Sequence, residues 1–299
     1  MGEVAAGRRP ALRKSADPTN GRPSSRRRCL RRREELKEYL KRPSRICVQV
    51  LMNNTSIKFA LLGDIHANLE ALVAVLSDAR DQGCTHFACV GDVVGYNASP
   101  GECLDIIRDM GMPCVKGNHD EYAESLAAVE NLNPRAAAAI FWTRQQLRES
   151  DKQWLRGLKY VCPVAGFTIV HATLDSPQRW GYVFDKLAAA ASFTYQNTSV
   201  CFYGHTHLPM AFIRDSLVRG GSYSRLAVEP GRKYFINVGS VGEPRDGNPL
   251  AAYVTYDLFQ GFIELRRVGY DAARTEARVR EAGLPLRRPP LVRDGGCPE

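Results

Sequence analysis

Gly63-Asp64-Ile65-His66-Ala67-Asn68 is the stretch that decides the fold. It follows the short apolar run at residues 59–62 and places an aspartate and a histidine, two residue types that bind metals, on the turn that ends this run. In open α/β sheets, ligands bind in the crevice at the carboxyl ends of the strands. The stretch therefore predicts a buried strand that delivers Asp64 and His66 to a functional site.

The same pattern, an apolar run that ends in Asp, Asn or His, recurs four times further along the chain. The polar side chains at these later turns are those of Asp92, Asn118, His119, His171, His205 and His207. Five of the six histidines lie on such turns, and only His86 falls inside a predicted strand, where we expect a structural role. Because chance placement would need five coincidences, the repetition predicts that these strand ends meet in one crevice.

The spacing of apolar residues predicts alternating strands and helices in the first half of the chain. Asn68 is the expected N-cap of a helix that ends at Gly83, and Ser99-Pro100-Gly101-Glu102 has the pattern of a capping box. A strand is expected at 86–90, another directly before Gly117, and a helix from Asn133-Pro134 onward. Six further strands, with few helices between them, are expected at 167–170, 200–203, 210–213, 234–238, 251–256 and 262–265. This succession predicts an α/β (α+β) sandwich with a second, largely antiparallel sheet packed on the first and helices outside.

Positive charge is concentrated at the start of the chain. The 299 residues carry a net charge of +9, of which residues 1–45 contribute +10 and the remainder −1. We expect residues 1–51 to form a basic, disordered leader, with Met52 as the natural start, and a nucleic-acid tether is the alternative. The expected domain occupies 52–270, followed by a short helix and tail at 271–299. A neutral body argues against nucleic acid as the main partner.

Cysteine usage and hydropathy favour a soluble protein of the cytoplasm. None of the nine cysteines forms a Cys-x-x-Cys pair, and several lie inside apolar runs, which is typical of reduced, buried thiols. No apolar run approaches the roughly 20 residues of a membrane span.

The expected ligands offer carboxylate and amide oxygens and imidazole nitrogens, and no thiolate. They are Asp64, His66, Asp92, Asn118, His171, His205 and His207. Such a set suits manganese, iron, zinc or nickel, and seven ligands are too many for one catalytic ion but suit two ions that share a carboxylate. Such a pair can hold a bridging hydroxide that attacks a phosphate ester. His119 is then placed to protonate the leaving oxygen, and Asp120 either orients His119 or is a surface carboxylate.

These motifs together resemble the calcineurin-like metallophosphoesterase superfamily, and in particular its compact bacterial and archaeal phosphodiesterases. They are Gly63-Asp64-Ile65-His66, Gly91-Asp92, Gly117-Asn118-His119-Asp120, His171 and Gly204-His205-Thr206-His207. The resemblance covers residues 57–271 and implies a four-layer sandwich, with two mixed sheets face to face and helices on the outer sides. It also implies a dinuclear centre, with manganese as the first expectation. By position, Asp64, His66 and His207 would bind one ion, Asn118, His171 and His205 would bind the other, Asp92 would bridge, and His119 would be the catalytic histidine.

One stretch departs from the family pattern. Gly91-Asp92-Val93-Val94-Gly95-Tyr96-Asn97 lacks the second acid and the arginine that protein phosphatases carry near the substrate, which argues against that activity. Asn68, Tyr96 and Asn97 are candidate substrate contacts, with a simple turn as the alternative for the last two. Arg245, in the glycine-rich loop 237–247, could bind a phosphate or form a structural ion pair with Asp246 or Glu243.

The expected activity is hydrolysis of a small phosphodiester or phosphomonoester, including nucleotides. The alternatives are a non-catalytic interaction protein on the same fold and a nuclease aided by the basic leader. Trp180 and Tyr182 could stack on a nucleobase or be packed in the interior. The pattern leaves open the natural substrate, the metals and the oligomeric state.

Overall fold

The computed structural model describes residues 2, 57–126, 129 and 132–287. Apart from Gly2, the expected leader at 1–51 lies outside the described residues, as do Met52 and the tail beyond residue 287. In the described part of the chain, no helix combines the length and hydropathy needed to cross a membrane.

The described strands form two mixed sheets. The first has the order β2-β1-β10-β11-β8 and the second the order β3-β4-β5-β9-β6-β7. The strands are β1 (Lys58–Leu62), β2 (His86–Cys89), β3 (Val161–Val164), β4 (Phe167–Val170), β5 (Val200–Tyr203), β6 (Ala211–Arg214), β7 (Val218–Gly221), β8 (Arg225–Ala227), β9 (Lys233–Asn237), β10 (Ala251–Asp257) and β11 (Phe262–Val268).

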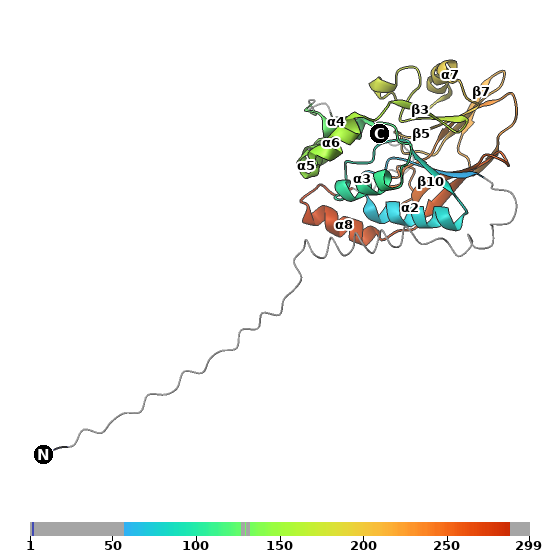
Figure 1. Ribbon diagram of the computed structural model, residues 1–299. Coiled ribbons are helices and arrows are strands. Elements are labelled where there is room, and N and C mark those ends of the chain that lie inside the picture. Colours follow the sequence, from blue (N-terminus) through green and yellow to red (C-terminus); the bar gives the residue numbers. More distant parts are fainter. Residues whose placement is uncertain (1, 3–56, 127–128, 130–131, 288–299) are drawn as a thin grey trace, which may run out of the picture. The chain divides into compact units, whose positions relative to one another are not determined.

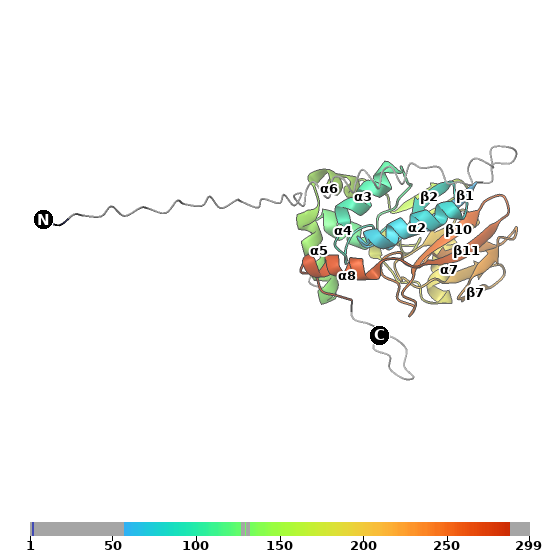
Figure 2. The same ribbon diagram turned by 90° about the horizontal axis from the view of Figure 1, so that it is seen from below.

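Helices lie on the outer face of each sheet and beside one end of the sandwich. They are α2 (Leu69–Asp81), α3 (Pro100–Asp109), α4 (Asn118–Glu124), α5 (Pro134–Gln146), α6 (Glu149–Arg156), the 3-10 turn η1 (Pro177–Arg179), α7 (Lys186–Tyr195) and α8 (Ala272–Glu281). Figure 1 shows α2 and α8 on the side of the first sheet, and α7 on the side of the second. Figure 2 shows α3, α4, α5 and α6 together beside one end of the sheets. The four-layer α/β sandwich expected from the sequence is confirmed.

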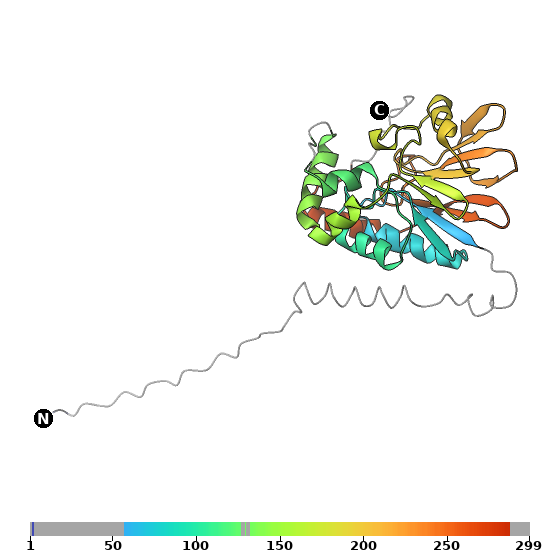
Figure 3. The ribbon, with the colours of Figure 1, turned by 45° about the horizontal axis from the view of Figure 1, so that its top comes forward.

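The core lies between the two sheets, which Figure 3 shows one above the other. Alternate residues of a strand point to opposite faces, so Phe59 and Leu61 of β1 meet Phe202 of β5 in this inner layer. Tyr203 of β5 points the other way, against Phe193 of α7. Burial on both faces explains why the sequence of β5 is apolar throughout.

Parallel strands bring the loops of both sheets to one place. β1 is parallel to β2, and β5 is parallel to both β4 and β9, so each set ends at one edge. Backbone hydrogen bonds then join the sheets: the Val241 amide donates to the Gly63 carbonyl at 3.1 Å, and the Gly242 amide to the Asp64 carbonyl at 2.9 Å. The loop after β1 is therefore fixed against the loop after β9.

Several local expectations differ from the structure. Strands β3, β7 and β8 were not expected, β10 and β11 belong to the first sheet, and the second sheet is mixed rather than largely antiparallel. Only isolated bridges occur where a strand was expected before Gly117. Asn68 caps α2 through its side chain, as expected, whereas the Ser99 side chain does not cap α3 and accepts a hydrogen bond from Arg278. Sheet membership and side-chain capping depend on distant partners, which local patterns do not contain.

Candidate metal centre

All seven predicted ligands meet where the strands end. They are Asp64, His66, Asp92, Asn118, His171, His205 and His207. Six of them are at most 5% exposed, and Asn118, in the first turn of α4, is partly exposed. Burying so many polar side chains together costs free energy unless each of them is hydrogen-bonded, paired with an opposite charge or bound to a metal.

The first group of ligands is formed by Asp64, His66 and His207. The Nε2 atom of His207 lies 3.3 Å from Oδ1 of Asp64, and Nε2 of His66 lies 3.9 Å from the same oxygen. The Nε2 atoms of the two histidines are 3.1 Å apart. One carboxylate oxygen and two ring nitrogens thus point into a space the size of one ion.

The second group is formed by Asp92, Asn118, His171 and His205. Nε2 of His171 lies 3.4 Å from Oδ2 of Asp92 and 3.3 Å from Oδ1 of Asn118. The rings of His171 and His205 have centroids 5.0 Å apart. Oδ2 of Asp92 is also 3.7 Å from Nε2 of His66, so Asp92 stands between the two groups.

Each of the four ligand histidines has one ring nitrogen against a backbone carbonyl oxygen. The pairs are His66 Nδ1 with Val94 at 3.2 Å, His171 Nδ1 with Val90 at 2.8 Å, His207 Nδ1 with Glu243 at 2.6 Å, and His205 Nε2 with Trp180 at 2.8 Å. A carbonyl oxygen only accepts, so that nitrogen carries a proton, and in the neutral ring the other nitrogen has a lone pair that faces the site. Metal-bound histidines usually have this second contact, which fixes the tautomer.

The lone pairs of the site face other acceptors. His66 and His207 turn unprotonated Nε2 atoms toward each other, and His171 turns its Nε2 atom toward carboxylate and amide oxygens. Such an arrangement is repulsive unless a metal ion lies between the groups or, in the metal-free chain, a second proton occupies Nε2 of His171. The residues therefore fit divalent metal ions, and a set of nitrogen and oxygen ligands without thiolate suits manganese, iron, zinc or nickel.

In the metal-free chain, the close packing of these histidines and carboxylates shifts their pKa values. Burial lowers the pKa of His205 to about 3, and the positive charge of His171 adds to the effect. Burial alone would also lower the pKa of His171, but the adjacent Asp92 carboxylate outweighs it and raises this pKa to about 10. The pKa of Asp92 is held well below its usual value because His171 and its neighbours outweigh the effect of burial.

His119 lies beside the two groups and, with His66 and Asp92, forms a third set of ligand-type atoms within 4.8 Å of one another. It follows Asn118 in the first turn of α4 and is 4% exposed, with its ring centroid 4.7 Å from that of His66 and 4.6 Å from that of Tyr96. Within the described part of the chain, its Nδ1 atom has no hydrogen-bond partner. Burial lowers its pKa to about 4. A buried imidazole with a free ring nitrogen is suited to exchange a proton with a bound ligand.

Asp120 has a different place from the one expected. Its Oδ1 atom accepts from the Val93 and Val94 amides at 2.9 and 3.3 Å, and its Oδ2 atom accepts from the Gly117 amide at 3.1 Å. Burial raises the pKa of Asp120 to about 7, and the negative charge of Asp92 adds to this effect. The side chain thus fixes the loop that carries Asp92, and among the described residues no hydrogen bond joins it to the His119 ring.

Two glycines of the sequence motifs allow the close approach of ligands. A Cβ atom on Gly117 would lie 2.1 Å from Oδ1 of Asp92, and one on Gly204 would lie 2.4 Å from Oδ2 of Asp64. Any side chain at these positions would therefore displace a carboxylate. This explains why glycine precedes the ligands in Gly117-Asn118 and Gly204-His205.

Asn68 and Asn97, expected as candidate substrate contacts, are used inside the protein. Asn68 is 1% exposed, and its side chain accepts from the Ala71 amide at 3.1 Å and donates to the Gly242 carbonyl at 3.2 Å. Asn97 is 5% exposed and donates to the His66 carbonyl at 2.8 Å. Both side chains therefore position ligand loops, which favours the turn interpretation of Asn97.

Tyr96 and Arg245 form a connected pair at the edge of the site. Tyr96 is 4% exposed, its ring contacts those of His66 and His119, and its hydroxyl accepts from Nη2 of Arg245 at 3.3 Å. Arg245 itself is exposed. The alternative ion pair with Asp246 or Glu243 is not formed among the described residues, because those carboxylates pair with other arginines.

Supporting residues at the end of β9 and in the loop after it were not predicted. The side chain of Asn237 donates to the Gly204 carbonyl at 2.6 Å, and the hydroxyl of Ser240 donates to the Asp64 carbonyl at 2.8 Å. The glycine-rich composition of this loop was the only signal in the sequence. Tyr182, expected to be packed or to stack on a base, is 51% exposed and stacks on His205 with centroids 4.3 Å apart.

Comparisons with known proteins agree with this geometry. Residues 57–260 match the profile of the calcineurin-like phosphoesterase superfamily domain. An uncharacterized protein of Methanocaldococcus jannaschii is 34% identical over 232 residues, which cover 76% of this chain and 93% of that protein. The chain therefore belongs to the calcineurin-like phosphoesterase superfamily, and the resemblance seen in the sequence is confirmed.

Solved structures place the fold in the same class. A metallophosphoesterase from Sphaerobacter thermophilus is 34% identical with a TM-score of 0.68, and the match covers 77% of this chain and 96% of that one. A hypothetical protein from Pyrococcus horikoshii has a TM-score of 0.62 at 17% identity, over 77% of this chain and 94% of that one, and is similar in fold alone. The protein is thus a metallophosphoesterase with candidate ligands for divalent metals.

Proposed function

We propose that this metallophosphoesterase uses two divalent metal ions to hydrolyse a small phosphodiester or phosphomonoester. The supporting observation is that four buried histidines converge with Asp64, Asp92 and Asn118 in two groups, between which Asp92 stands. The first ion would be held by Asp64, His66 and His207, and the second by Asn118, His171 and His205. Two such ions, when bound, supply a hydroxide nucleophile at neutral pH and stabilise charge on the phosphoryl oxygens.

The residues around the ions would have separate tasks. We assign to His119 the protonation of the leaving oxygen, because its ring is buried against that of His66 and offers a nitrogen within 4.8 Å of the ligand-type atoms of His66 and Asp92. Asp120 fixes the loop of Asp92, so we treat it as a positioning residue. The burial of the ligands limits access of bulk water, which strengthens electrostatic interactions with the reacting phosphate.

The expected partner is a small phosphate ester, and manganese is the metal we propose. Nitrogen and oxygen ligands without thiolate support this choice, although iron, zinc and nickel suit the same set. Nucleic acid is not proposed as substrate, because the chain beyond residue 45 has a net charge of −1. We also propose a cytoplasmic location, which the free thiols of the described cysteines support.

The test is hydrolysis by the metal-free protein after separate addition of manganese, nickel, zinc or magnesium. A nitrophenyl phosphodiester and the corresponding monoester would be compared, with bound metal counted in the same samples. We expect turnover that requires about two ions per chain, and the ratio of the two rates then distinguishes a diesterase from a monoesterase.

Asp92→Asn provides the matched control, because it keeps the shape of the side chain and removes its charge. We expect this variant to bind less metal and to lose turnover in proportion. Full metal content without hydrolysis of either ester by the unmodified protein would contradict the proposal. If the protein bound no metal, the proposed metal centre itself would be refuted.

A further inference from the structure

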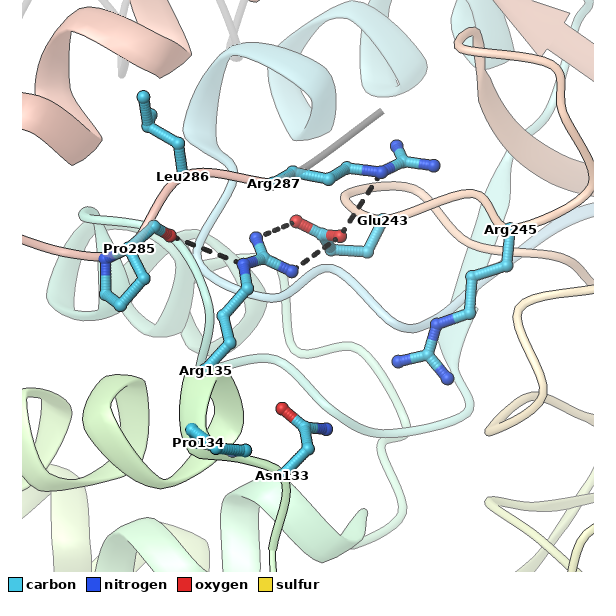
Figure 4. A pocket seen from close by; sticks show the side chains of 8 residues that line it. All are labelled: Asn133, Pro134, Arg135, Glu243, Arg245, Pro285, Leu286 and Arg287. Carbon is cyan, nitrogen blue, oxygen red and sulfur yellow. Dashed lines mark hydrogen bonds and ion pairs between the residues drawn. The ribbon is translucent and has the colours of Figure 1, made fainter. Parts of the chain in front are cut away.

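A cavity of about 590 Å³ lies beside the metal centre, and its charged lining is mostly arginine. Three arginines and one glutamate line it: Arg135 at the start of α5, Glu243 and Arg245 in the loop after β9, and Arg287 beyond α8 (Figure 4). This volume is within the usual range of small-molecule sites. The lining has a net charge of +2, which favours an anionic ligand.

The single carboxylate of the cavity is already engaged. Oε1 of Glu243 lies 2.6 Å from Nη2 of Arg135, and Oε2 accepts from Nη1 of the same arginine at 3.2 Å. Arg287 lies 3.8 Å from Oε2. Figure 4 shows these contacts and, apart from them, the guanidinium of Arg245. In the described chain, Arg245 has no carboxylate partner, and its hydrogen bond goes to the neutral hydroxyl of Tyr96.

The cavity and the metal centre share a wall. The carbonyl of Glu243 accepts from Nδ1 of the ligand His207 at 2.6 Å, and the Arg245 amide donates to the His207 carbonyl at 3.4 Å. Tyr96 completes this wall: its ring contacts His119, and the guanidinium carbon of Arg135 lies 4.5 Å from its centroid. Two residues that line the cavity, Glu243 and Arg245, are therefore in direct backbone contact with the candidate ligand His207.

We propose that this cavity binds a second phosphate group of the substrate, so that the protein prefers esters with a phosphate beyond the one that is cleaved. The inference rests on the proposed phosphoesterase function and specifies its substrate class. Guanidinium groups suit this task, since their planar fork donates two parallel hydrogen bonds to phosphate oxygens. Arg245 would make the main contact, because its charge is not neutralised within the described structure.

Binding can be measured without turnover. Inorganic pyrophosphate would be titrated calorimetrically into metal-free protein kept in chelator, where the aspartates of the empty ligand groups repel the anion. We expect binding that weakens with added salt, and Arg245→Ala should reduce the affinity roughly 10- to 100-fold. Arg219→Ala is the matched control, because Arg219 is an exposed arginine of β7 whose partner is Asp215. Absence of binding, or equal loss in both variants, would overturn the inference.

Turnover supplies the second test. Two substrates would be compared, thymidine 5′-(nitrophenyl phosphate) with and without a 3′-phosphate, which release the same leaving group. We expect the 3′-phosphate to raise kcat/KM about tenfold or more in the unmodified protein and in Arg219→Ala, but not in Arg245→Ala. Hydrolysis of both esters at equal kcat/KM would refute the second-phosphate inference alone. Hydrolysis of neither would count against the proposed phosphoesterase function itself.

Discussion

Strained backbone conformations gather at the candidate metal ligands. The residues with positive φ among the seven are Asp64 at 48°, His66 at 49°, Asp92 at 51°, His205 at 67° and His207 at 60°. Such conformations cost on the order of 1–3 kcal/mol each and persist only where the surroundings fix them. Here the two ligand loops fix each other, since the Asp64 amide donates to the Gly91 carbonyl and the His66 amide to the Asp92 carbonyl, both at 3.0 Å. The ligands are thus held in place before any metal binds.

Removing the His119 ring should separate proton transfer from metal binding. His119→Ala leaves both ligand groups complete, so we expect unchanged metal content and a fall in kcat of about 10²- to 10⁴-fold. The loss should be larger for an alkyl ester than for a nitrophenyl ester, because nitrophenolate leaves without a proton. Steady-state rates on the two esters, with metal counted, check this.

His86→Ala serves as the control for this experiment, since His86 is an exposed histidine of β2 outside the site. It should keep the activity of the unmodified protein. If His119→Ala hydrolysed the alkyl ester at the full rate, the role assigned to His119 would be wrong.

The metal-free protein should lose stability in acid. The pKa values of His119 and His205 are lowered by burial to about 4 and about 3, below the value of 6.5 in an unfolded chain. The pKa of His66 is lowered too. As pH falls below 6.5, the unfolded state therefore binds these protons first, and stability decreases. Asp120 acts in the opposite sense: its pKa is raised to about 7, so its protonation stabilises the fold as pH falls.

Three groups thus oppose one, because His171, with its pKa raised to about 10, is already protonated in the folded state and adds only a small stabilising effect as its unfolded form completes protonation. We expect the free energy of unfolding to fall by on the order of 2 kcal/mol between pH 6.5 and 5. Urea denaturation in chelator measures it. His119→Ala, with one buried imidazole fewer, should lose less stability. If the free energy of unfolding of the unmodified protein stayed constant or rose as the pH fell, the predicted direction of the effect would be wrong.

At the scale of residues, the sequence was most informative about side chains that follow apolar runs. The seven ligands and His119 could be chosen because each follows or lies near a recognisable run, and the structure brings them together. The carbonyl groups that fix the histidine tautomers could not be chosen in this way. Those of Val90, Val94, Trp180 and Glu243 become partners only through tertiary structure.

At the scale of elements, the β3–β4 hairpin offers a stability test away from the site. Its two-residue turn, Ala165 and Gly166, has φ values of 39° and 92°, and positive φ at both positions is the pattern of a type I′ turn. Asparagine tolerates this conformation better than alanine. We expect Ala165→Asn to raise the free energy of unfolding by about 1 kcal/mol, and thermal denaturation measures this.

Ala165→Val is the control for the turn, because a β-branched residue resists positive φ and should lower stability. Both variants should keep the metal content and turnover of the unmodified protein, since Ala165 is exposed and lies in the turn before β4, at the opposite end of this strand from His171. A lower melting temperature for the asparagine variant would show that the turn geometry is wrongly described.

Inner strands were easier to predict from the sequence than edge strands, because only inner strands are buried on both faces. The inner strands β4 and β5 are buried on both faces and therefore read as continuous apolar runs. The edge strands β7 and β8 are largely exposed, and β7 contains two glycines, so their pairing partners rather than their composition make them strands. The same limit explains why β10 was not assigned to the sheet of β1, from which it is distant in sequence.

At the scale of the whole molecule, charge and chemistry occupy different parts of the chain. Residues 1–45 carry a net charge of +10, whereas the rest carries −1 and contains every candidate ligand. Affinity for a nucleic-acid backbone depends on the number of phosphates that Lys and Arg neutralise, and it falls steeply with salt. Any affinity of the full chain for DNA should therefore reside in residues 1–45.

Deleting residues 1–51 tests this separation. The family match begins at residue 57, so we expect the shortened chain to keep two ions and to hydrolyse small nitrophenyl esters at an unchanged rate. Its affinity for a short DNA duplex should fall to background, and the linear dependence of the logarithm of affinity on the logarithm of salt concentration should disappear. If DNA cleavage by the full chain were lost while ester hydrolysis remained, the nuclease alternative would gain support, because the leader would then be delivering the substrate. If DNA affinity survived the deletion, the neutral part of the chain would have to contain a binding surface that its charge does not predict.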